Sequence, residues 1–149
     1  MKRILFLCTG NYYRSRYSEE YFNHFSEQYG LSWIADSKGI MREFKGNGNV
    51  GPIAKHTIDE LVKHKITAKG LDRYPAYVFE EDLNNFDRII AVSLDEHKPM
   101  LEDLWPDSLS KVEYFDVEDL HLEGFETALP RLTKHLDKLI SSIRETVVD

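Results

Sequence analysis

One segment near the amino terminus restricts this chain more than any other. Cys8, the only cysteine, follows the apolar run Ile4–Leu7, and five residues separate it from Arg14, where a helical pattern begins. A short apolar run that is ended by turn residues predicts a buried strand. A strand that passes through a tight loop into a helix directs unpaired backbone N–H groups and the positive end of the helix dipole towards one point. The segment 8–15 therefore predicts an anion site with a thiol beneath it.

The residues of this loop have the properties that a cysteine-based phosphatase requires. The helix N-terminus favours the thiolate of Cys8, which would act as the nucleophile. The guanidinium of Arg14 can hold two phosphoryl oxygens at once. A buried, inert cysteine is the alternative interpretation, but packing explains poorly why Gly, Asn and Arg follow it. The remaining phosphate donors are expected from the backbone of Thr9, Gly10, Asn11, Tyr12, Tyr13 and Ser15.

Strand and helix patterns alternate along the chain and predict an α/β fold. Short apolar strands are expected over residues 2–7, 31–35, 88–92 and 111–115. Helices are expected over residues 14–29, 52–64, 94–104 and 126–147, with a short helix or turn at 78–83. The alternation predicts a single domain, residues 1–149, with a four-stranded parallel sheet flanked by helices on both faces in a Rossmann-like arrangement.

Polar residues follow each predicted strand and should meet at one edge of the sheet. In parallel sheets the ligand site lies beyond the carboxyl ends of the strands. We therefore expect the fold, rather than sequence proximity, to assemble the site from Cys8, Ser37, Ser93 and Asp119.

These segments resemble the low-molecular-weight protein tyrosine phosphatases, which place such a loop directly after their first strand. The similarity continues beyond the loop through residues 33–37, 51–66, 86–90 and 116–119. It implies the phosphotyrosine phosphatase I type of fold and a hydrolase that acts on phosphotyrosine proteins or small aryl phosphates through a phosphocysteine intermediate, without a cofactor. It also implies that Asn11, Ser15 and Ser37 support the loop, and that Ser15 donates a hydrogen bond to the thiolate.

The acidic turn at residues 116–119 lies where this family has its general acid. We expect Asp119 to protonate the leaving oxygen and then to activate water, with Asp116 as the alternative. The family usually has Pro after the catalytic Asp, whereas Leu120 follows here.

The residues expected to line the entrance to the phosphate site also differ from those of the family. His121 and Leu122 stand where the family has aromatic residues. Tyr12, Tyr13 and Phe44 are the candidates to supply aromatic walls instead. A narrow entrance would favour small aryl phosphates over phosphotyrosyl peptides.

Composition excludes several classes of function. A net charge of −7 argues against a nucleic-acid partner, and no apolar run approaches membrane-spanning length. One cysteine allows no internal disulfide, fits a cytoplasmic protein and excludes a thioredoxin-coupled arsenate reductase. The six histidines show no metal-ligand spacing, so no metal is expected, and His64 and His97 should be structural. The expected partner is a phosphotyrosine protein or a small phosphate ester, bound by a monomer or a weak homodimer.

Two other functions use a similar loop. A phosphotransfer carrier would store phosphate on the cysteine, but Arg14 and an acid at Asp119 favour hydrolysis. A phosphate- or phosphoprotein-binding module would retain the loop with weak or no catalysis, and Leu120 keeps this alternative open.

Overall fold

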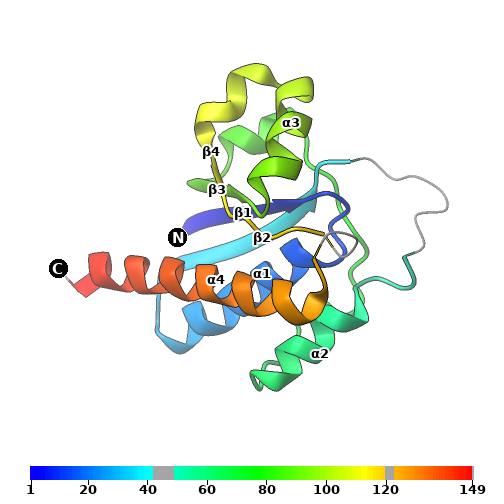
Figure 1. Cartoon of the computed structure of the whole chain (residues 1–149). Coiled ribbons are helices and arrows are strands. Elements are labelled where there is room, and N and C mark those ends of the chain that lie inside the picture. Colours follow the sequence, from blue (N-terminus) through cyan, green and yellow to red (C-terminus); the bar gives the residue numbers. More distant parts are fainter. Residues whose placement is uncertain (42–48, 120–122, 149) are drawn as a thin grey trace.

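The structure is a computed structural model that describes residues 1–41, 49–119 and 123–148. Its centre is a parallel four-stranded sheet in the order β2-β1-β3-β4 (Figure 1), which confirms the predicted sheet. The strands are β1 (Lys2–Cys8), β2 (Trp33–Gly39), β3 (Arg88–Ala91) and β4 (Val112–Tyr114). The chain runs outward from β1 to β2 and then returns past β1 to β3. Strand order therefore changes direction beside β1, which is where ligands bind in such folds.

Helices cover both faces of the sheet, as predicted (Figure 1). One face carries α1 (Arg14–Gln28) and α4 (Phe125–Val148), with α2 (Lys55–Lys63) packed beside them. The other face carries α3 (Leu94–Leu104) and the short 3-10 helices η1 (Glu80–Asn84) and η2 (Pro106–Lys111).

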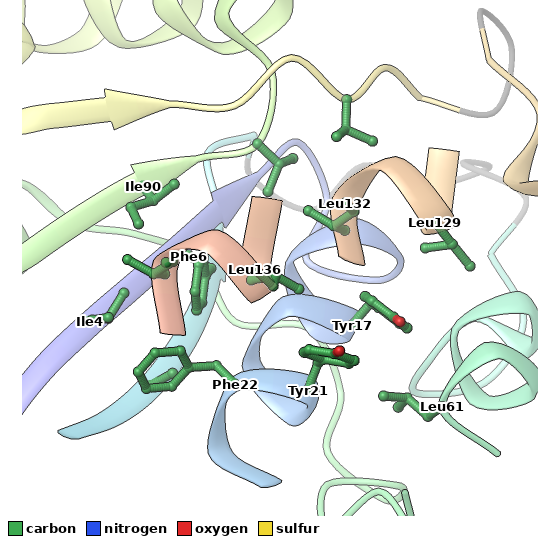
Figure 2. Close-up of a cluster of buried hydrophobic side chains, with 14 of the residues drawn as sticks. Ile4, Phe6, Tyr17, Tyr21, Phe22, Leu61, Ile90, Leu129, Leu132 and Leu136 are labelled. Atoms are coloured by element: carbon green, nitrogen blue, oxygen red, sulfur yellow. The ribbon is translucent and has the colours of Figure 1, made fainter. Parts of the chain in front are cut away.

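The protein has one hydrophobic core on each face of the sheet, and the central strand β1 contributes side chains to both. Successive side chains of a strand point to opposite faces, so Ile4 and Phe6 enter the core against α1 and α4 while Leu5 and Leu7 enter the core beneath α3. All four side chains are fully buried. Figure 2 shows the larger core, in which Phe6 lies close to α1 and α4. A strand that is buried on both sides holds its carboxyl end, and therefore Cys8, in a fixed position.

The tyrosines of the first helical segment lie in the core near the start of α1 and at the surface just after its end. Tyr17 and Tyr21 are buried and bond α4 through their hydroxyls, which lie 2.6 Å from Thr133 Oγ1 and 2.5 Å from Asp137 Oδ1. Tyr29 is 39% exposed. The helix was expected to reach about residue 29 and ends at Gln28, and Gly30 at φ +65° follows its last turn.

Strand β2 differs most from its prediction. The apolar run at 31–35 predicted its position, but the strand runs from Trp33 to Gly39 and includes polar residues. It is an edge strand, and side chains of α1 occupy its outward backbone groups. Asn23 accepts from the N–H of Ala35 at 2.7 Å and donates to its carbonyl at 2.9 Å, while Ser26 donates to the carbonyl of Trp33. These bonds protect an edge that would otherwise pair with another chain.

The other boundaries shift by a few residues. Helix α2 begins at Lys55, so Pro52 precedes the helix instead of opening it. The predicted turn at 78–83 is η1, and Pro130 lies inside α4. Strand β4 is shorter than the predicted 111–115, and β3 ends one residue before Val92. Among the described residues, no helix has both the length and the apolar character needed to cross a membrane.

Candidate active site

Cys8 is the last residue of β1, and α1 begins at Arg14, so the predicted strand–loop–helix turn is present. The sulfur is buried, lies 2.9 Å from Oγ of Ser15 and accepts the backbone N–H of Asn11 at 3.3 Å. Asn11 has a φ of 54°, in the left-handed region that Asn enters more readily than most residues. Donors therefore converge on the sulfur at the start of a helix, which is the environment that a nucleophilic thiolate needs.

Asn11 braces the loop through all of its side-chain polar atoms. Its Nδ2 donates to Oγ of Ser15 and to Oγ of Ser37, both at 2.9 Å. Its Oδ1 accepts from Arg73 and from the backbone N–H of Ala76, both at 3.0 Å. The structure therefore brings together Asn11, Ser15 and Ser37 as expected, although Ser37 lies within β2 rather than after it.

Arg73 and Glu19 complete this support, and sequence analysis missed both. Arg73 Nη2 donates to Glu19 Oε1 and to Ser37 Oγ at 2.9 Å each, and Ser37 Oγ donates to Glu19 Oε1 at 2.6 Å. Burial raises the pKa of Glu19, and its bonds to Ser37 and Arg73 oppose that shift. Glu19 lies one helical turn after Ser15 and could have been suspected from that spacing. Arg73 lies in an irregular segment with no comparable signal.

Replacing Arg73 with alanine should loosen the loop. Four acceptor groups, three of them in the loop support, would lose a donor. We expect kcat/KM for an aryl phosphate to fall ~10- to 100-fold and the free energy of unfolding to fall by about 1–3 kcal/mol. Steady-state kinetics and urea unfolding measure the two effects. Arg88→Ala is the matched control, because the Arg88 side chain is as exposed as that of Arg73 and forms an ion pair with Glu113 across β3 and β4, at the opposite edge of the sheet from the loop support. Equal losses in both variants would contradict a specific role for Arg73.

Strand β2 also passes very close to the phosphate loop. A Cβ on Gly39 would lie 2.9 Å from the carbonyl oxygen of Thr9 and 3.0 Å from the backbone of Gly10. Directly after the strand, Ile40 donates its N–H to the carbonyl of Cys8 at 2.9 Å. Gly39 therefore has no room for a side chain. At Gly10 a Cβ would meet no atom of the described residues within 4 Å, and the proposed ligand would lie against this side of the loop.

Arg14 is buried and points to the start of α3. Its Nη1 donates to Glu96 Oε2 at 2.7 Å and to the carbonyl of Val117 at 2.9 Å, and its Nη2 donates to Glu96 Oε1 at 3.2 Å. Its Nε is buried and has no hydrogen-bond partner among the described residues. Burial by itself would lower the pKa of Arg14, but Glu96, Cys8 and Asp119 outweigh it, so the pKa lies above its ordinary value. The guanidinium stays charged, and its Nε–H and one Nη2–H are left for an anion.

Three further side chains form a chain of hydrogen bonds beneath the loop. Thr9 donates its hydroxyl to Glu96 Oε1 at 2.6 Å and lies 3.1 Å from Nε2 of His97. His97 accepts the backbone N–H of Ser93 on Nδ1 at 3.1 Å, so its proton is on Nε2 and points to Thr9. Burial, aided by the charge of Arg14, lowers the pKa of His97 to about 3. His97 therefore stays neutral and structural, as expected, although it lies directly under the site.

The two candidate acids occupy different environments. Asp119 Oδ2 lies 3.7 Å from Nη2 of Arg14, and the Asp119 side chain is 34% exposed. Asp116 is 72% exposed and pairs with Arg131 and His135 of α4. The hydrogen bond with His135, with a further contribution from Arg131, holds the pKa of Asp116 below its ordinary value. The geometry thus brings Asp119 to the loop and ties Asp116 to α4.

Comparison with known proteins agrees with this site. The family model for low molecular weight phosphotyrosine protein phosphatases matches residues 3–148. The chain belongs to this family. It is therefore a phosphatase of the phosphotyrosine-protein class, as predicted. No curated protein matches the chain in sequence.

Solved structures share the phosphatase fold along their whole length. YfkJ from Bacillus subtilis is 27% identical with a TM-score of 0.81, and the match covers 98% of this chain and 96% of YfkJ. The low molecular weight protein tyrosine phosphatase of T. tengcongensis is 29% identical with a TM-score of 0.77, covering 95% of this chain and 99% of that protein. The arginine phosphatase YwlE is 20% identical with a TM-score of 0.74, covering 99% and 97% of the two chains, which shows a common fold.

The two neighbouring tyrosines of the phosphatase loop have different environments. Tyr12 is half-buried, and its hydroxyl donates to the carbonyl of Val50 at 2.6 Å and accepts its N–H at 3.2 Å. Tyr13 was expected to be a second wall, but it is 5% exposed and joins the core against α1 and α4. Burial raises the pKa of its phenol. The prediction for the Tyr13 side chain is therefore wrong, because the turn into α1 points it inward.

Several residues singled out by the sequence lie outside the described residues, namely Phe44, Leu120, His121 and Leu122. Within the described ranges, no group of three His, Cys, Asp or Glu side chains could hold a metal ion.

Proposed function

We propose that the phosphatase hydrolyses phosphotyrosine and small aryl phosphates with Cys8 as nucleophile, Arg14 as oxyanion ligand and Asp119 as general acid. The observation that supports this most is the arrangement around the loop. The sulfur of Cys8 receives donors from Ser15 and Asn11, while the buried Nε of Arg14 has no partner in the described part of the chain. A buried donor without a partner is costly unless a ligand satisfies it.

The reaction would proceed in two displacements. In the first, the sulfur of Cys8 forms a bond to phosphorus as the phosphorus–oxygen bond to the leaving group breaks, and Asp119 gives its proton to that oxygen. In the second, Asp119 takes a proton from water as the water oxygen attacks phosphorus. The sulfur–phosphorus bond then breaks, which releases inorganic phosphate and regenerates the thiolate.

The loop would stabilise both transition states by the same means. Arg14 and the backbone N–H groups of residues 9–15 would face the equatorial oxygens, where charge increases during transfer, except the N–H of Asn11, which donates to the sulfur. Ser15 would donate to the sulfur as it leaves in the second step, because its Oγ lies 2.9 Å from Sγ. Asn11, Ser37 and Arg73 would hold the loop without touching the substrate.

The entrance indicates recognition by close contact. Tyr12 presents an aromatic ring beside the loop and is fixed by its two bonds to Val50, so it would form one wall for the phenyl ring of the substrate. The chain carries a net charge of −7, so long-range attraction would not draw in an anionic substrate. The single cysteine fits action in the cytoplasm, as a monomer or weak homodimer on phosphotyrosine proteins or small phosphate esters.

A substrate panel with an intermediate trap tests this function. We expect p-nitrophenyl phosphate and phosphotyrosyl peptides to be hydrolysed and phosphoseryl peptides to react far more slowly. Phosphoarginine belongs in the panel because the similarly folded YwlE is named an arginine phosphatase. Rapid denaturation during turnover, followed by mass spectrometry, should place the trapped phosphate on Cys8. If no substrate is hydrolysed while inorganic phosphate or vanadate still raises the melting temperature, the protein is a phosphate-binding module instead.

Peroxide should inactivate the enzyme with poor recovery. Cys8 is the only cysteine in the chain, and the residue before Arg14 is Tyr13. No disulfide within the chain can therefore trap the first oxidation product before it advances to sulfinic or sulfonic acid. Activity after peroxide and then dithiothreitol measures the recovery, and inorganic phosphate present during oxidation should protect. Full and rapid recovery would contradict this expectation.

A further inference from the structure

We propose that Glu96 is a positioning residue for the reaction, acting through Arg14. This inference rests on the proposed roles of Cys8 and Arg14 and adds a residue that no sequence pattern indicated. Glu96 lies in the first turn of α3, 82 positions from Arg14 in the chain, and its carboxylate binds the guanidinium with both oxygens at 2.7 and 3.2 Å. Such two-point pairs set the orientation of a guanidinium as well as its location.

Glu96 is itself held in place by its surroundings. Its backbone N–H donates to the side chain of Ser93, the N-cap of α3, at 3.2 Å. Its Oε1 accepts the hydroxyl of Thr9 at 2.6 Å, and the ring of His97 determines the direction of that hydroxyl because its Nε2–H points to the Thr9 oxygen. A carboxylate with fixed partners on both sides makes a rigid support for Arg14.

The pairing leaves one edge of the guanidinium for the substrate. Arg14 has five N–H groups. Two on Nη1 bond Glu96 and Val117, and one on Nη2 bonds Glu96. The Nε–H and the second Nη2–H remain, and the buried Nε has no partner among the described residues. Glu96 thus occupies the Nη1–Nη2 end of the guanidinium. The other edge, formed by Nε–H and the second Nη2–H, can then meet two phosphoryl oxygens.

Glu96 also changes the charge that the substrate meets. Its burial would raise its pKa, but Arg14 outweighs burial and lowers it, so the carboxylate is ionised beside the buried guanidinium. The pair is close to neutral overall, so it binds oxyanions less through net charge than through oriented N–H groups. Loss of Glu96 would therefore disturb the orientation needed in the transition state while making Arg14 more attractive to a phosphate ion in the ground state.

The test compares Glu96→Ala and Glu96→Gln with Asp95→Ala. Asp95 is exposed in the same first turn of α3 and carries the same charge, so it controls for net charge and for the helix dipole. We expect kcat for p-nitrophenyl phosphate to fall ~10- to 100-fold in Glu96→Ala, with a smaller loss in Glu96→Gln, which retains one acceptor for Arg14. We expect the dissociation constant of inorganic phosphate, measured by calorimetry, to stay the same or decrease. A merely structural role would weaken phosphate binding and kcat together.

A double-mutant cycle with Thr9→Val tests whether Thr9 acts through Glu96 or affects the loop independently of it. If the Thr9 hydroxyl acts only by holding Glu96, the losses in Thr9→Val and Glu96→Ala are not additive in the double variant. Additive losses, a kcat in Glu96→Ala equal to that in Asp95→Ala, or a parallel loss of phosphate binding would each overturn the proposal. Absence of hydrolysis in the wild-type protein would instead overturn the proposed function, so the two failures are distinguishable.

Discussion

Replacing Cys8 with serine is expected to lower kcat for aryl phosphates by at least ~10³-fold. Serine has the same shape, and its hydroxyl would still lie near Ser15 and the N–H of Asn11. The chemistry is lost because an alkoxide is far harder to form than a thiolate and because the serine oxygen is a much poorer leaving group in the second step. The variant should therefore bind phosphate esters and turn them over extremely slowly.

Kinetics and binding measured on the same preparation test this expectation. The residual rate with p-nitrophenyl phosphate gives the loss in kcat, and the rise in melting temperature with inorganic phosphate reports an intact loop. Cys8 is the only cysteine, so a thiol-alkylating reagent should inactivate the wild type in a 1:1 ratio. Cys8→Ser activity close to that of the wild type would refute nucleophilic catalysis by Cys8.

Replacing Asp119 with alanine is expected to lower kcat ~100-fold or more for substrates with poor leaving groups. Asp119 lies within 3.7 Å of the loop arginine, close enough to the transferred group to deliver a proton to the leaving oxygen. An activated leaving group such as p-nitrophenol needs little protonation. Asp119→Ala should therefore slow the first displacement less with p-nitrophenyl phosphate than with phosphotyrosine. The slope of log kcat/KM against leaving-group pKa should therefore become steeper in the variant.

Asp116→Ala is the matched control for this prediction. The same acidic turn supplies both residues, but Asp116 pairs with Arg131 and His135, and His135 holds its pKa low, so it is ionised and turned to α4. A general acid must carry a proton when substrate binds, which Asp116 is poorly suited to do. We expect Asp116→Ala to retain most of its kcat and to lose some stability. An inactive Asp116→Ala beside a fully active Asp119→Ala would reverse the assignment.

Local pattern predicted the loop because its parts are adjacent in the chain. Cys8, Asn11 and Ser15 lie within one strand–loop–helix turn, so spacing alone brought them together. Tyr12 and Tyr13 show the limit of the same method. They are identical neighbours in the sequence, but Tyr12 bonds Val50 beside the loop and Tyr13 enters the core, because the backbone turn before α1 determines which way each side chain points.

The extent of β2 illustrates a second limit. Its apolar beginning could be seen in the sequence, whereas its polar continuation through Asp36 and Lys38 could not. Pairing with β1 along the whole segment and the side chain of Asn23 on its outer edge stabilise the strand there. Strand preference depends on such neighbours more than on the residues themselves.

The sequence by itself determined the fold class and the family, and it predicted the nucleophile and the oxyanion ligand, because these depend on short spacings and on the alternation of strands and helices. Only the tertiary structure decided which groups support them. Arg73 reaches Asn11 across 62 positions, and Glu96 reaches Arg14 across 82. Such contacts leave no periodic signal, since a hydrogen bond or an ion pair needs only two complementary groups that the folded sheet edge brings within about 3 Å. The sequence predicts what the loop does, and the packing of α3 and β2 around it shows how the loop is held.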